Sequence, residues 1–200
     1  MKAYHFVGDT LRDGRPVPAD GEWLVHTGAV IMCRSGFHAS EHPFDALQYA
    51  PGNTLCLVDL EGSIQRGEDK VCGRRRRIIK RIDATELLQE FARWCALEVI
   101  HLWDAPDVVV RYLMTGDPLL RAEATAAMPA TLAAAARDTS TAPAAWAQVA
   151  AWEAWGAWET RVVAATEAAA ATAREAAATA RAKQRDKFAS MVESAFNGVE

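Results

Sequence analysis

The chain has 200 residues, of which half are hydrophobic, and its formal net charge is −4 at pH 7. This length allows one large domain or two small ones with a buried core. No apolar run approaches the roughly 20 residues that a membrane-spanning helix needs. The N-terminal stretch MKAYHFVGDT also lacks the apolar core of a signal peptide. We therefore expect a soluble, cytoplasmic protein with no membrane function.

The composition changes near residue 83. Residues 1–83 hold 12 Lys or Arg, 11 Asp or Glu, most of the glycines and four of the five histidines. The remainder is acidic and rich in alanine and tryptophan. This contrast predicts an α+β protein, in which a mixed β-rich domain with a short helix at 1–83 precedes an all-α helical region at 84–200.

Alternating apolar residues predict the strands of the first domain. We expect strands over 2–7, 54–62 and 71–83, a broken strand within 23–33 and a short strand over 37–40. A short helix is expected over 41–50, with Ser40 as its N-cap and Pro43 in its first turn.

The second region has the periodicity of helices, expected at about 84–102, 107–114, 118–136 and 143–196. Residues 161–182 contain 12 alanines, and Ala is the best helix former. Trp152, Trp155 and Trp158 recur at every third position, so they share one side of their helix. This stripe makes a homo-oligomer reasonable, although a solvated helix with a thin apolar seam also accounts for the composition.

A first candidate for chemistry is a metal site. Cys33, His38 and His42 are residue types that zinc accepts. The four cysteines are far apart, however, and none forms a C-x-x-C pair. Cysteines on apolar strands are most often buried thiols, and we therefore expect no metal.

The second candidate is the basic run RRRRIIKR over residues 74–81. On a strand, Arg74 and Arg76 would point to one side and Arg75 and Arg77 to the other, with Ile78, Lys80 and Ile82 sharing a side. The run could hold phosphates of a nucleotide or a nucleic acid, contact a protein partner, or protect an edge strand from aggregation. The candidate anion- or partner-binding residues are Arg74, Arg75, Arg76, Arg77, Lys80 and Arg81.

The order of the segments AYHF, SGFHAS, FDALQYA and TLCLVDLEG resembles ADP-ribosyltransferases of the diphtheria-toxin and poly-ADP-ribose polymerase type. The resemblance implies NAD as cofactor, with His5 on the ribose, Phe37 and His38 near the nicotinamide, and Tyr49 at the end of the helix. The catalytic glutamate of that family would be replaced here by Glu68 or Asp69.

Most of the N-terminal half also resembles a domain found in phage and prophage proteins, through the C-x-x-G-F-H-A core that begins at Cys33, the V-x-L-x-G strand at Val58 and the EDK that ends at Lys70. This resemblance implies no known activity. The function that we favour is that of a phage-type protein that binds a host protein complex, for example an inhibitor of a bacterial defence system such as CRISPR. The alternatives are an NAD-dependent ADP-ribosyltransferase or nucleotide-binding enzyme and a nucleic-acid-binding protein.

Overall fold

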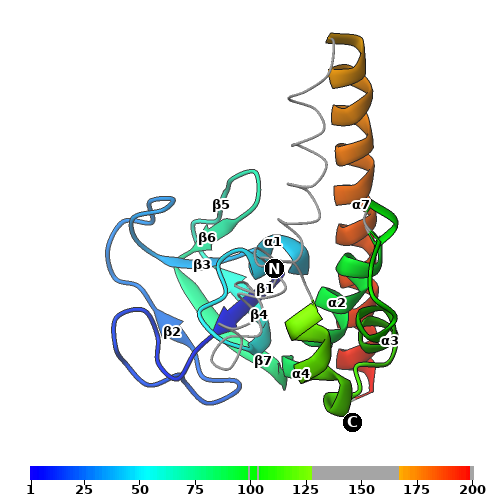
Figure 1. Ribbon diagram of the computed structural model, residues 1–200. Coiled ribbons are helices and arrows are strands. Elements are labelled where there is room, and N and C mark those ends of the chain that lie inside the picture. Colours follow the sequence, from blue (N-terminus) through cyan, green and yellow to red (C-terminus); the bar gives the residue numbers. More distant parts are fainter. Residues whose placement is uncertain (99, 103, 128–166, 199–200) are drawn as a thin grey trace. The chain divides into compact units, whose positions relative to one another are not determined.

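The computed structural model describes residues 1–98, 100–102, 104–127 and 167–198 (Figure 1). These divide into two compact units, one made of Met1–Glu86 with Phe188–Glu200, the other of Leu87–Lys187. The strands belong to the first unit and most of the helices to the second, which confirms the α+β fold class. The expected helices over 128–136 and 143–166, and the stripe of Trp152, Trp155 and Trp158, lie outside the described residues.

The larger sheet of the first unit has the strand order β1-β4-β7-β2 and is antiparallel throughout. Its strands are β1 (Lys2–Val7), β2 (Leu24–Val25), β4 (Thr54–Glu61) and β7 (Arg75–Asp83). The strand expected over 2–7 is confirmed. Within 23–33 a regular strand forms only at Leu24–Val25.

A second, smaller sheet has the order β3-β6-β5 and consists of β3 (Phe37–Ala39), β5 (Gln65–Arg66) and β6 (Val71–Gly73). The single strand expected over 71–83 is therefore two strands that belong to different sheets. The chain changes sheets at Arg74, whose backbone N–H donates to the Gly62 carbonyl oxygen at 2.7 Å. This switch joins the end of the small sheet to the start of the longest strand.

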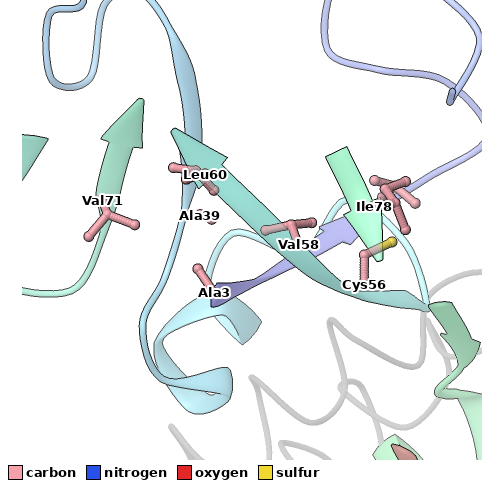
Figure 2. Packing of buried hydrophobic residues seen from close by; sticks show 8 residues of the cluster. Ala3, Ala39, Cys56, Val58, Leu60, Val71 and Ile78 are labelled. Atoms are coloured by element: carbon pink, nitrogen blue, oxygen red, sulfur yellow. The ribbon is translucent and has the colours of Figure 1, made fainter. Parts of the chain in front are cut away.

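The main core lies between the two sheets. Directly paired residues of antiparallel strands share a face, and β4 places Cys56, Val58 and Leu60 on the same face. Figure 2 shows these side chains with Ala3 of β1 and Val71 of β6, and all five are 2 % exposed or less. We call this side of the larger sheet its inner face.

A β-bulge changes which residues of β7 point inward. Ile78 pairs with Val58 but Lys80 pairs with Leu57, so Ile79 is an extra residue. Ile78 consequently lies on the inner face, whereas Lys80 and Ile82 lie on the opposite one, which we call the outer face. The expectation that Ile78, Lys80 and Ile82 share a side is wrong, because it assumed uninterrupted alternation.

The outer face is covered in part by the C-terminal end of the chain. The Phe196 ring lies 6.4 Å from the ring of Tyr4, and the Phe196 carbonyl oxygen accepts a hydrogen bond of 2.8 Å from Lys80 Nζ. Phe188 is fully buried and makes an edge contact with Phe44 at 6.3 Å. The last turns of the chain therefore complete the fold of a unit that otherwise ends at Glu86.

The helix α1 (Pro43–Leu47) follows the small strand β3. Its N-cap is His42, whose Nδ1 accepts the Phe44 backbone N–H at 3.2 Å. Ser40 was the expected cap, but it is buried and exchanges backbone hydrogen bonds with Tyr4 of β1. That prediction is wrong because pairing with β1 extends the strand past the residue that was expected to begin the helix.

The second unit is helical. Its elements are α2 (Thr85–Glu98, which starts in the first unit), η1 (Ile100–Leu102), α3 (Asp107–Thr115), α4 (Pro118–Ala127) and the first part of α7 (Glu167–Asn197). Val109, Leu113 and Ala124 form the buried contact between α3 and α4. None of the helices in the described ranges is both long and apolar enough to cross a membrane.

Candidate functional site

The basic run places one arginine in the interior. Arg76 lies on the inner face opposite Leu60 and is 6 % exposed. Its Nη1 donates to the His38 carbonyl oxygen at 2.7 Å, and its Cζ lies 5.4 Å from the centroid of the Phe37 ring. Burial lowers the pKa of Arg76 to about 10. A cation between two sheets is an uncommon feature, because desolvation of an ion is costly.

His38 is held by hydrogen bonds in a neutral form. Its Nε2 accepts the Cys33 backbone N–H at 3.0 Å, so the proton is on Nδ1, which lies 3.9 Å from the Cys72 Sγ. Burial lowers the pKa of His38 below its usual value, a hydrogen bond with the Gly36 backbone opposes this, and the nearby charges of Lys70 and Arg76 lower it again. Because Nε2 is occupied, His38 acts through its carbonyl oxygen, which positions Arg76.

His5 lies on the same inner face, because β1 pairs it with Cys56. Enclosure of the ring lowers the pKa of His5 well below its usual value, and the charge of Arg76 and the neighbouring His38 lower it further. Part of its surface remains exposed. Within the described residues, neither ring nitrogen has a hydrogen-bond partner, so the neutral imidazole can donate to or accept from a ligand.

The backbone conformation of residue 36 and its close neighbours explain why a glycine precedes Phe37 and His38. Its φ is +102°, a conformation that side chains rarely adopt, and a Cβ at this position would lie 2.8 Å from Cys72 Sγ. The close approach brings β3 against β6 and presents the partly exposed Phe37 ring beside Arg76. We refer to His5, Phe37, His38 and Arg76 together as the Arg76 centre.

The outward-pointing cations of the run have carboxylate or carbonyl partners. Arg77 Nη2 lies 2.8 Å from Asp59 Oδ2, and Arg75 Nη1 lies 3.4 Å from Glu61 Oε2. Both guanidinium groups also stack over Trp23, with Cζ at 4.8 and 4.5 Å from its ring centroid. The expected alternation of Arg75 and Arg77 against Arg76 is thus found.

The remaining cations of the run are placed elsewhere. Arg81 Nε donates to Asp20 Oδ1 at 2.6 Å, and Lys80 contacts the Phe196 carbonyl. Arg74 is partly exposed and packs against Gly62. The six candidate residues of the run therefore do not form one common surface.

Tyr49 lies in a separate group of polar side chains. Its hydroxyl donates to Asp69 Oδ2 and accepts from Lys70 Nζ at 2.9 Å, and Gln48 Nε2 donates to the same carboxylate at 2.9 Å. Burial, followed by the hydrogen bond to Asp69, raises the pKa of Tyr49. We call Gln48, Tyr49, Asp69 and Lys70 the Tyr49 cluster. The structure thus joins two predicted residues, Tyr49 and Asp69, and places Glu68 as an exposed neighbour.

Three contributions were missed by the sequence analysis, namely the burial of Arg76 and the roles of Lys70 and Cys72. Alternation separated Arg76 from Arg75 and Arg77, but it did not say which of them faces the core. Lys70 and Cys72 stand next to β3 because β6 pairs with it, with His38 opposite Cys72. No local pattern in the sequence predicts that β3 pairs with β6.

In the part of the chain that the structure describes, no group of three His, Cys, Asp or Glu side chains is arranged to hold a metal ion. The fold and the site define an α+β domain with a buried cationic centre between two sheets. Residues 1–90 match the model of a family described as "Domain of unknown function (DUF7666)". No curated protein and no solved structure matches the chain.

Proposed function

We propose that the first unit binds a nucleotide-type ligand, of which NAD and ADP-ribose are the first examples to test, at the Arg76 centre. One observation carries the proposal. Phe37 and the His38 carbonyl oxygen of β3 contact one buried guanidinium of β7, and His5 of β1 lies on the same inner face of the larger sheet. An aromatic ring, a neutral imidazole and an arginine are the groups that contact the ring, the ribose and the phosphates of a nucleotide.

The binding step is tested by isothermal titration calorimetry and thermal shift on the full chain with NAD and with ADP-ribose. We expect saturable binding that raises the melting temperature. His5→Ala should weaken it at least about tenfold, because a hydrogen bond to the ligand is lost. His101→Ala, which changes an exposed histidine of the second unit, is the matched control. Absence of a shift with either ligand would refute the proposal.

Catalysis is a separate proposal that depends on Asp69 or Glu68. The Asp69 carboxylate is oriented by Tyr49 and Gln48, which supports a positioned role for Asp69 more than for the exposed Glu68. If the domain is an ADP-ribosyltransferase, release of nicotinamide from NAD should be lost in Asp69→Asn and retained in Glu68→Gln. Binding without release in the unmodified protein would identify a binding domain.

A protein-binding function, such as that of a phage-type inhibitor of a host defence complex, is the second candidate. Two large apolar side chains, Val25 of β2 and Ile31 of the segment between β2 and β3, are 57 % and 45 % exposed and support it. The test is a pull-down from a bacterial lysate, in which a stoichiometric partner should be lost with Val25→Ser and Ile31→Ser together. Nucleic-acid binding has less support, since Arg75 and Arg77 would have to leave Glu61 and Asp59.

A further inference from the structure

The feature that the domain's architecture leaves unexplained is the buried charge of Arg76. A guanidinium stays protonated in proteins, so burial does not neutralise it. It therefore needs compensating groups in its surroundings. In the described part of the chain the guanidinium has the His38 carbonyl oxygen at 2.7 Å and the Phe37 ring at 5.4 Å. Neither of these groups carries a negative charge.

The neighbouring arginines form ion pairs with carboxylates of the same domain. Arg75, Arg77 and Arg81 pair with Glu61, Asp59 and Asp20. Among the described residues no carboxylate pairs with Arg76, and the groups that raise its pKa are the thiols of Cys56 and Cys72. Arg76, the least solvated cation of the run, thus has no anionic partner among the described residues.

The surroundings of Arg76 can admit an anion. The Phe37 ring, 5.4 Å from the Arg76 Cζ, belongs to a residue that keeps part of its surface exposed, so solvent comes near the guanidinium on this side. The His38 carbonyl oxygen accepts the hydrogen bond from Arg76 Nη1. The other N–H groups of the guanidinium are left for oxygens of a ligand. A guanidinium with several N–H donors suits an anion with several oxygens, such as a phosphate.

We infer that Arg76 is the receptor for a phosphate group of a ligand, with His38 as the positioning residue, because its carbonyl oxygen holds Nη1. The inference shares its location with the proposed function, but it does not require the ligand to be NAD. The same chemistry is offered by free phosphate, by pyrophosphate and by the diphosphate of a nucleotide.

The experiment uses the full chain and titrates orthophosphate, pyrophosphate, ADP-ribose and acetate by calorimetry at constant ionic strength. Pyrophosphate and ADP-ribose should bind saturably. Arg76→Met should weaken both at least about tenfold, the loss expected for one charge-assisted contact. Arg77→Met, on the same strand but paired with Asp59, is the matched control and should leave both affinities within twofold.

Two results would overturn the inference. One is equal binding of pyrophosphate by the unmodified chain and Arg76→Met, and the other is binding of acetate without binding of any phosphate probe. If Arg76→Met does not fold, the Arg76 Nε–H resonance of the unmodified chain decides. A shift that saturates with pyrophosphate supports the inference, and an unchanged resonance refutes it.

The same titrations separate this inference from the proposed function. If ADP-ribose binds equally well to Arg76→Met, the proposed nucleotide binding is supported and the role of Arg76 as phosphate receptor is refuted. If pyrophosphate binds through Arg76 while neither ADP-ribose nor NAD binds, the role of Arg76 as phosphate receptor is supported and the proposed nucleotide binding is refuted.

Discussion

Neighbouring arginines of β7 on the two faces of the larger sheet differ in their burial and in their partners. On the outer face, Arg75 and Arg77 are partly solvated, pair with Glu61 and Asp59, and stack over Trp23. On the inner face, Arg76 is enclosed between two sheets with only neutral groups bonded to it among the described residues. Adjacent residues of one basic run therefore differ in burial and in the charge of the groups that they contact. The following predictions test this contrast.

The largest effect should come from the residue that helps to close the outer side of the first unit. Phe188 is fully buried and contacts Phe44. Phe188→Ala should lower the free energy of unfolding by about 3–5 kcal/mol, because a cavity replaces the ring. Urea unfolding of the full chain measures this, and Phe188→Leu should lose much less. A loss below about 1 kcal/mol would show that the C-terminal segment contributes little to this unit.

The pH dependence of stability tests the inner face. The folded-state pKa values of His5 and His38 are lowered, so below about pH 6.5 the unfolded chain binds protons that the folded chain does not. Stability should be fully present above pH 6.5 and fall as the pH decreases below it. Each histidine contributes a slope of at most about 1.4 kcal/mol per pH unit.

Chemical denaturation at several pH values between 7.5 and 5.5 measures this slope. His5→Phe, which keeps a ring but cannot titrate, should flatten the curve. An unchanged slope in His5→Phe would mean that the imidazole is not enclosed beside Arg76.

A charge without an anionic partner should be dispensable for folding. We expect Arg76→Met to leave the free energy of unfolding unchanged or to raise it by up to about 2 kcal/mol, since the cost of burying a cation disappears while one hydrogen bond is lost. Thermal and urea unfolding in phosphate-free buffer measure this. A loss of 3 kcal/mol or more would indicate a structural arginine with a full set of partners.

The smallest effect is expected for the outer ion pair. A double-mutant cycle with Asp59→Ala and Arg77→Ala should give a coupling energy of about 0.2–1 kcal/mol, because both side chains are partly exposed to solvent. Raising the salt concentration should reduce it further. A coupling that is both larger and independent of salt would place this pair in the same class as a buried one.

Local sequence was sufficient for the elements whose signals are short-range. The alternation in KAYHFV and TLCLVDLE predicted β1 and β4, and the change of periodicity after residue 83 predicted the helices α2 and α3. The separation of Arg76 from Arg75 and Arg77 also followed from alternation. These features depend on neighbours in the chain, and so a single sequence contains them.

Long-range pairing decided the rest. The sheet change at Arg74 and the bulge at Ile79 set which cations point inward, while pairing of Ser40 with Tyr4 moved the helix cap to His42. The sequence by itself determined an α+β protein with a basic strand and a histidine-containing turn. Only the tertiary structure brought Phe37 and His38 to Arg76 and placed His5 on the same face of the sheet, because each comes from a strand whose partner lies tens of residues away.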